Sequence, residues 1–224
     1  MRKDKLVVNE IYHIYNKSIA DFIIYNREEE FLRMLSTIGY YRREEPKISF
    51  SRFLRDVDPE KDHSESYYNP RNKRKLVEII AYCLMPTHFH LILKQFTDNG
   101  ISIFMSNLQN SYARYFNLKH KRKGPLWEGR FKSVLIKTDT QLIHLTRYIH
   151  LNPATSRLVN DPEKWLMSSY NEYLAKTDEN KNICNYHGVL DIEPVIYKKF
   201  VEDRLSYQRE LAKIKGLLLE PQPC

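Results

Sequence analysis

The sequence has 224 residues, of which 42% are hydrophobic, which is enough for one substantial core but hardly for two full-sized domains. Lysine and arginine number 36 against 28 aspartates and glutamates, and the formal net charge of +8 favours a polyanionic partner. The cysteines Cys83, Cys184 and Cys224 are far apart and form no CxxC pair, so neither a disulfide framework nor a cysteine zinc site is indicated. No segment approaches the roughly 18 consecutive apolar residues that span a bilayer, and the basic start lacks a signal peptide's apolar stretch. We therefore expect a cytoplasmic protein without a membrane partner.

The first part of the chain predicts a strand, a helix and a polar insertion. Residues 11–18, IYHIYNKS, are rich in aromatic and β-branched side chains, which indicates a strand. Residues 27–41 carry apolar side chains at helical spacing and acidic residues in the first turn, where the helix dipole favours them. From about residue 44 to 74 the composition shifts to Pro, Ser, Asn, Asp and mixed charge. We expect an insertion here, with a short helix near residues 50–57.

Two apolar runs, residues 76–84 and 88–94, follow the insertion and predict a β-hairpin. The residues between them, Met85, Pro86 and Thr87, form a proline-containing turn signal. A longer helical pattern then covers residues 100–118.

A basic loop, a fourth strand and a further helix are expected next. The loop covers residues 119–130, and residues 131–137 have the composition of a strand. Residues 138–153 predict a helix that a proline stops. Thr138, with Gln141 three residues later, is a capping-box signature for the start of this helix.

The order of these elements predicts an α+β fold: a ferredoxin-like βαββαβ antiparallel sheet with an added C-terminal helix and a further helical extension. Residues 161–175 are expected to form helix or compact coil, residues 176–188 a polar linker, and residues 194–218 a charged amphipathic helix. The predicted organisation is one domain over residues 1–175, followed by the linker and helix of residues 176–224.

A histidine pair stands at the start of the second hairpin strand, in 84-LMPTHFHLILK-94. Successive strand side chains point to opposite faces, so His88 and His90 share one face while Phe89 points to the other. Two imidazoles on one face can share a divalent metal, which needs a third ligand from elsewhere. For an arbitrary HxH pair, however, two half-buried strand histidines without a metal are the commoner case.

One stripe of the helix expected at residues 138–153 carries polar side chains at offsets 0, 3, 7 and 11: Gln141, His144, Tyr148 and Asn152. A polar stripe beside an apolar one is ordinary for a surface helix. The chain has 16 tyrosines, so the stripe alone is weak evidence for any one of them.

Two motifs in combination are more specific: 85-MPTHFHLI-92 and 147-RYIHLNP-153 occur in this order, with a strand and a basic loop between them. With both, the chain resembles the HUH single-tyrosine transposases, which include insertion-sequence transposases and REP-associated tyrosine transposases. The resemblance covers about residues 12–173. It includes 126-LWEGRFKS-133 and 165-WLMSSYNEYL-174, which are typical of the REP-associated branch.

The resemblance implies roles for individual residues. His88 and His90 would be ligands of Mg²⁺ or Mn²⁺, with Asn152 as the third protein ligand. Tyr148 would be the nucleophile of a DNA transposase that cuts and rejoins single-stranded DNA next to hairpins through a 5′-phosphotyrosine intermediate. His144 is an alternative third ligand or proton acceptor.

Two other positions on this helix carry structural expectations. The residue before a proline is pushed away from helical geometry, so Asn152 is expected at a frayed helix end. His150 lies about 200° round the helix from Tyr148 and is expected to be structural.

Cations and aromatic side chains are interleaved around the basic loop, a mixture that can neutralise phosphates and stack an exposed base. The predicted DNA-binding residues are Lys119, Lys121, Arg122, Lys123, Trp127, Arg130 and Lys132. The alternative is a solvated charged loop with Trp127 packed on the core.

Two other functions remain open at this point: a non-catalytic nucleic-acid binder on the same fold, and a metal-dependent nuclease that uses water. The sequence also leaves open whether the protein is a homodimer, in which Tyr148 serves the histidines of a second subunit.

Overall fold

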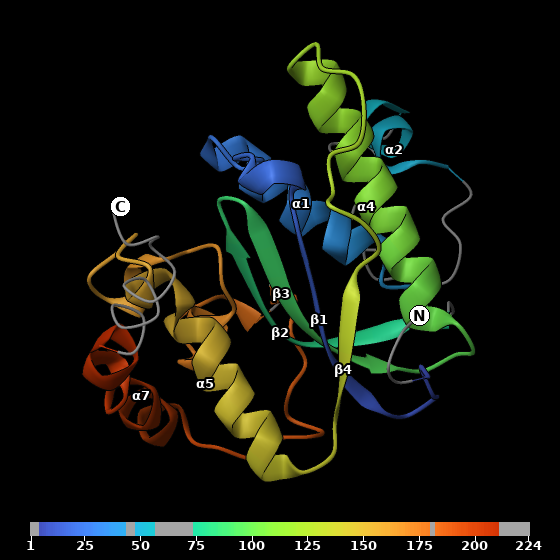
Figure 1. Cartoon of the computed structure of the whole chain (residues 1–224). Coiled ribbons are helices and arrows are strands. Elements are labelled where there is room, and N and C mark those ends of the chain that lie inside the picture. Colours follow the sequence, from blue (N-terminus) through green and yellow to red (C-terminus); the bar gives the residue numbers. More distant parts are fainter. Residues whose placement is uncertain (1–4, 44–47, 57–73, 180–181, 211–224) are drawn as a thin grey trace, which may run out of the picture.

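A four-stranded antiparallel sheet with helices on both faces forms the centre of the protein (Figure 1). The computed structural model describes residues 5–43, 48–56, 74–179 and 182–210. The strand order across the sheet is β2-β3-β1-β4, which is the ferredoxin-like arrangement and confirms the predicted fold class. No helix in the described part of the chain is long and apolar enough to cross a membrane.

The strands are β1 (Ile11–Lys17), β2 (Val77–Met85), β3 (His88–Gln95) and β4 (Lys132–Ile136). The predicted hairpin is present, because β2 and β3 pair antiparallel and Met85 lies opposite His88 across a turn of two residues. β1 lies between β3 and β4. The start of β3 therefore lies beside the end of β1, with His90 opposite Tyr15.

One face of the sheet is covered by α1 (Glu28–Tyr41), α2 (Phe50–Asp56) and α4 (Gly100–Lys119) (Figure 1). The core on this face includes Phe89, Leu91 and Leu93 of β3, packed with residues of α1 and α4. Phe89 therefore faces away from the histidines of its strand, as its position between them predicts. The short helix expected near residues 50–57 is α2, and the rest of the predicted insertion lies largely outside the described residues.

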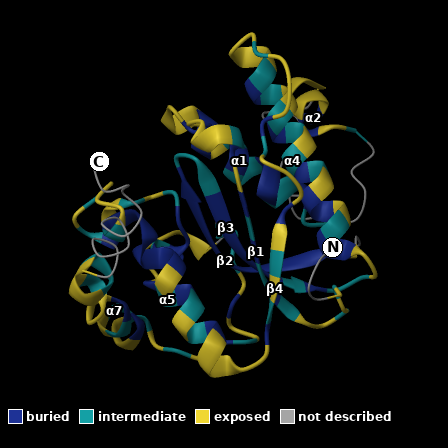
Figure 2. Cartoon of the chain, viewed as in Figure 1, coloured by how far each residue is buried: buried dark blue, intermediate teal, exposed yellow. Residues whose placement is uncertain are grey.

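The other face is covered by α5 (Asp139–Thr155) and by the segments that follow it: η2 (Pro162–Lys164), α6 (Tyr170–Tyr173) and α7 (Pro194–Glu202). This second core joins β2 side chains to buried residues of α5, α6 and α7. Figure 2 shows the strands largely buried between the two helical layers, whereas part of the edge strand β4 is exposed.

The predicted stop of the helix at Pro153 is wrong, because α5 continues through Pro153 and ends at Thr155. A proline inside a helix removes one backbone hydrogen bond. Here the last turn is buried and held from outside the helix, since the Nε atom of Arg209 donates to the carbonyl oxygen of Ala154 at 3.1 Å. Tertiary packing therefore keeps Asn152 helical and buried, and the expectation of a frayed end is wrong as well.

The expected continuous helix over residues 194–218 is also interrupted. α7 ends at Glu202, the backbone turns at residues 203–204, and helical backbone resumes at residue 205. The turn is closed by the Arg204 N–H, which donates to the carbonyl oxygen of Val201 at 3.3 Å. Residues 211–218 lie outside the described part of the chain.

Candidate active site

A pocket of about 370 Å³ opens at the start of β3, on the face of the sheet that α5 covers. It is lined by Tyr15, Asn16, Lys17, Asp21, Thr87, His88, Phe89, His90, Glu128, Lys132 and Tyr148. The pocket therefore brings together the histidine pair and the tyrosine, which lie on different elements far apart in the sequence.

The two strand histidines present their rings side by side to this pocket. The ring centroids of His88 and His90 are 5.2 Å apart and the ring planes are perpendicular. The Nδ1 atom of His88 lies 3.1 Å from the Thr87 hydroxyl, and the Nδ1 atom of His90 lies 2.9 Å from Nε2 of His13. Among the described residues no hydrogen bond engages Nε2 of either His88 or His90, so these atoms remain available to a ligand.

Burial keeps both rings neutral. It lowers the pKa of His88 below its usual value, and it lowers the pKa of His90 well below 6.5, where the neighbouring His13 and His88 add to the effect. The neutral imidazole is the form that coordinates a metal ion. The site is therefore in the ligating protonation state at neutral pH.

Tyr148 projects from α5 toward the histidines. Its ring meets the His90 ring edge-on, at 83° and 6.0 Å between centroids, and the residue remains 45% exposed. Partial burial raises the pKa of its phenol, while the side chain of Asn152 lowers this pKa in opposition. The hydroxyl is thus accessible to a substrate, but it needs positive charge or a base to ionise near neutral pH.

Asn152 lies one helical turn after Tyr148 and is only 8% exposed. Its side chain is close enough to Tyr148 to lower the pKa of the phenol, although the contact falls short of hydrogen-bond geometry. The Nδ2 atom of Asn152 is buried and has no hydrogen-bond partner among the described residues. Asn152 is not among the residues that line the pocket. Two neutral imidazoles and an amide oxygen belong to the nitrogen and oxygen ligand set of divalent metals. The contact that ties Asn152 to the site is the one with Tyr148.

The two histidines of α5, His144 and His150, make contacts outside the pocket. The Nη2 group of Arg147 donates to Nδ1 of His144 at 2.7 Å, and the His144 ring lies 5.5 Å from that of Phe200 in α7. His144 does not line the pocket.

His150 is fully buried and bridges the Tyr197 hydroxyl and the Ser169 hydroxyl, at 2.7 Å each. Burial lowers its pKa to about 3. The structural role expected for His150 is therefore confirmed.

Several pocket residues had not been singled out from the sequence, among them Tyr15 and Lys17 of β1, Asp21 and Glu128. The Nζ atom of Lys17 lies 3.7 Å from Asp21 and 3.6 Å from Glu128, so the rim of the pocket carries an exposed cluster of charges. The strand period of two could have found Tyr15 and Lys17, because β1 turns alternate residues to the histidine face. Asp21 has a positive φ of 51°, a backbone geometry that no local pattern signals for this residue type.

Three of the predicted DNA-binding residues are engaged within the protein. Lys119 forms ion pairs with Glu29 and Glu30 of α1. Arg122 donates to the carbonyl oxygen of Pro125 at 2.8 Å and to the Asn117 side chain at 3.1 Å.

Trp127 packs on the core, which is the alternative that the sequence left open. Its Nε1 donates to the Gln109 carbonyl oxygen at 3.1 Å, and its ring meets that of Phe89 at 5.4 Å.

The remaining predicted DNA-binding residues are free to meet a polyanion. Lys132 lines the pocket, with its Nζ atom 5.9 Å from the centre of the Tyr15 ring. Lys121, Lys123 and Arg130 are exposed, and none has an ion pair among the described residues.

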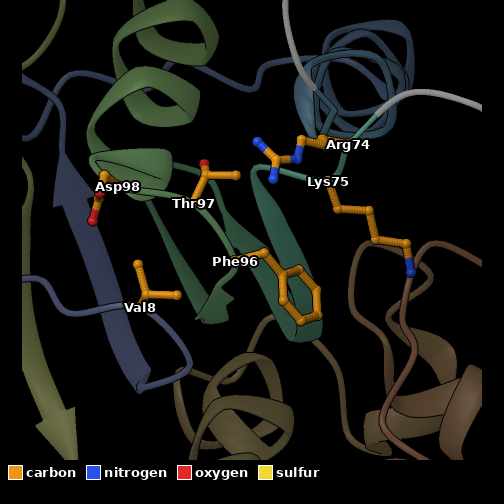
Figure 3. A pocket seen from close by; sticks show the side chains of 6 residues that line it. All are labelled: Val8, Arg74, Lys75, Phe96, Thr97 and Asp98. Carbon is orange, nitrogen blue, oxygen red and sulfur yellow. The ribbon is translucent and has the colours of Figure 1, made fainter.

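A second pocket, of about 560 Å³, lies at the opposite end of β3 and is lined by Val8, Arg74, Lys75, Phe96, Thr97 and Asp98 (Figure 3). The side chains of Arg74 and Lys75 extend in different directions there, and Lys75 is paired with Glu78 at 2.7 Å. This pocket is larger but contains no histidine, cysteine or tyrosine. The acidic group of Asp161, Glu163 and Glu202 is no better candidate, because Glu163 is paired with Lys176 and Lys198.

A family model covers the part of the chain that contains these residues. Residues 53–152, which include the histidine pair, Tyr148 and Asn152, match the family model described as IS200-like transposase. A Haemophilus influenzae protein assigned as a REP-associated tyrosine transposase is 27% identical over 103 residues, which cover 42% of this chain and 58% of that protein. The chain thus spans just over half the length of this relative.

One solved structure shows the same fold. The structure of a REP-associated tyrosine transposase bound to a REP hairpin matches with a TM-score of 0.54 and 14% identity, over 86% of this chain and 98% of that one. A protein assigned as a transposase from Deinococcus radiodurans matches with a TM-score of only 0.35 and 18% identity, over 66% of this chain and 95% of that one. Residues 53–152 thus match the IS200-like transposase model, and the chain has the fold of a solved REP-associated tyrosine transposase.

Proposed function

We propose that the protein is a metal-dependent DNA transposase that cleaves and rejoins single-stranded DNA next to hairpins. The observation that carries the proposal is the pocket in which His88, His90 and Tyr148 meet. The family match over the same residues supports it, as does the likeness to a transposase whose solved structure contains a REP hairpin.

The metal would be Mg²⁺ or Mn²⁺, held by Nε2 of His88, Nε2 of His90 and the side chain of Asn152. Such an ion, when bound, polarises the scissile phosphodiester and offsets negative charge in the transition state. The chain's own contribution is a pair of neutral imidazoles on a rigid strand and a buried amide on the helix that carries the nucleophile.

Tyr148 supplies the nucleophile. Its phenol oxygen attacks the phosphorus atom, the bond to the 3′ oxygen breaks, and the 3′ oxygen gains a proton. The products are a 5′-phosphotyrosine and a free 3′ hydroxyl. The phosphotyrosyl bond keeps the diester linkage, so a 3′ hydroxyl can attack it, release Tyr148 and reseal a strand without ATP.

Positive charge at the pocket assists this step. Lys132 and Lys17 line the pocket and favour the approach of a phosphate. Lys121, Lys123 and Arg130 extend the cationic surface along the loop that leads into β4. We propose that the DNA backbone binds to this surface. The contacts of Lys119, Arg122 and Trp127 within the protein stabilise the loop instead.

The DNA must be single-stranded where it is cut, because side chains on a sheet face reach a paired and stacked backbone only if the duplex is distorted. Tyr148 and the histidines that it meets belong to the same chain, which supports a complete site in one protomer.

Incubation of the protein and Mn²⁺ with end-labelled single-stranded DNA hairpins tests the proposal on a denaturing gel. We expect a metal-dependent band of protein linked covalently to DNA. Cutting without a covalent band would favour a nuclease that uses water, and binding without cutting would favour a non-catalytic binder.

A further inference from the structure

We propose that His13 is a positioning residue for the metal site. Its Nε2 atom accepts a hydrogen bond from the Nδ1–H group of His90, which leaves the lone pair of His90 Nε2 for the pocket. The inference rests on the proposed function, because it identifies His13 as the residue that orients the proposed metal ligand His90.

The geometry of neighbouring strands holds the two rings together. His13 lies on β1, where its backbone pairs with that of Ile92, two residues after His90 on β3. The rings are stacked, with centroids 5.1 Å apart and planes 20° apart, and Nε2 of His13 is 2.9 Å from Nδ1 of His90. The Tyr15 ring stacks on the His13 ring at 5.0 Å and lies 6.0 Å from the His90 ring.

Only one hydrogen atom can lie between the two nitrogen atoms. A neutral imidazole has one N–H group and one lone pair, so one ring donates and the other accepts. If His90 donates from Nδ1, its Nε2 carries a lone pair. If His13 donates instead, Nε2 of His90 carries the hydrogen and cannot coordinate a metal. The direction of the hydrogen bond with His13 therefore decides whether Nε2 of His90 can coordinate a metal.

The second histidine has no comparable partner. Nδ1 of His88 contacts the Thr87 hydroxyl, which rotates to donate or accept and so follows whichever tautomer His88 adopts, whereas the role of His13 is tied to the tautomer of its own ring. The pair is therefore asymmetric: the ring of His90 is fixed by another ring, and that of His88 by a rotatable hydroxyl.

Three variants test the role. His13→Leu removes the acceptor, His13→Gln keeps an acceptor oxygen at similar reach, and His187→Leu removes an exposed histidine that does not line the pocket. Mn²⁺ affinity is measured by calorimetry on each full-length protein. We expect His13→Leu to bind Mn²⁺ about 10–100-fold more weakly, the effect typical of losing an outer-shell partner. His13→Gln should recover most of the affinity, and His187→Leu should match the wild type.

Nitrogen-15 NMR of the metal-free wild type gives a second readout that needs no variant. We expect the His90 proton on Nδ1. Equal Mn²⁺ affinity in wild type and His13→Leu, or a wild-type proton on His90 Nε2, would overturn the inference. A wild type that binds Mn²⁺ and forms the covalent DNA band retains the proposed function in either case, so the two failures are distinguishable.

Discussion

Tyr148 of α5 meets His90 of β3 edge to face, with 6.0 Å between the two ring centroids. The helix is held in this position by α7, since the Arg147 guanidinium lies 4.2 Å from the centre of the Phe200 ring. The segment after the tyrosine helix thus returns to fix that helix over its own sheet. The proposed nucleophile and the proposed histidine ligands are brought together by packing within a single chain.

The histidine pair should be essential to metal binding and to cleavage. We expect His88→Ala and His90→Ala each to lower Mn²⁺ affinity by more than the roughly 100-fold upper range of outer-shell changes, because a direct ligand is lost. Calorimetry with Mn²⁺ and a cleavage assay measure the two effects. His187→Ala serves as the exposed control, and metal binding unchanged in both site variants would refute the assignment.

Asn152 and His144 are competing candidates for the third ligand, and paired substitutions separate them. Neither residue lines the pocket, but Asn152 is buried with an unsatisfied amide, whereas His144 is exposed and engaged by Arg147. We expect Asn152→Ala to weaken Mn²⁺ binding at least about tenfold and His144→Ala to leave it unchanged. The reverse pattern would transfer the role to His144.

The salt dependence of DNA binding should distinguish free cations from paired ones. Arg130→Ala and Lys123→Ala should each weaken binding to single-stranded DNA and reduce the slope of log affinity against log salt by about 0.7, the value for one lost phosphate contact. Lys119→Ala is the matched control, since Lys119 is occupied by Glu29 and Glu30. Equal slopes for all three variants would show that the exposed cations do not contact phosphates.

Stability should fall in acid because of buried histidines. The pKa of His150 is lowered to about 3 in the folded protein, from 6.5 for a free histidine, so between these pH values the unfolded chain binds more protons. The free energy of unfolding therefore falls as pH drops from 6.5 towards 3, by at most about 1.4 kcal/mol per pH unit for this group. Urea unfolding at several pH values measures it.

A His150→Gln variant supplies the control for this slope, because glutamine keeps hydrogen-bonding groups but does not titrate. It should unfold with a shallower dependence on pH below 6.5. An unchanged slope would mean that other groups cause the acid sensitivity.

The sheet and the faces of its strands could be predicted because hydrophobic alternation is a local signal. The turn at Pro86 and Thr87 marks the hairpin, and Phe89 between the two histidines fixes which way they point. That Tyr148 reaches these histidines came from the resemblance to known transposases, since spacing along the chain does not say where a helix packs.

What was missed depends on tertiary contacts. A lone His13 carries no signal until the register of β1 against β3 is known. Pro153 does not end α5, because the last turn is buried and its carbonyl groups find donors elsewhere. In the basic loop, the sequence does not distinguish Lys119 and Arg122 from the exposed cations beside them. Their partners within the protein are evident only from the fold.

The central claim is that Tyr148 forms the covalent link to DNA, and peptide mass spectrometry of the trapped adduct tests it most directly. Tyr15 lines the same pocket, so Tyr148→Phe and Tyr15→Phe form a matched pair. We predict a phosphodiester adduct on the peptide that contains residue 148, lost in Tyr148→Phe and retained in Tyr15→Phe. An adduct on Tyr15, or one that persists in Tyr148→Phe, would contradict the claim.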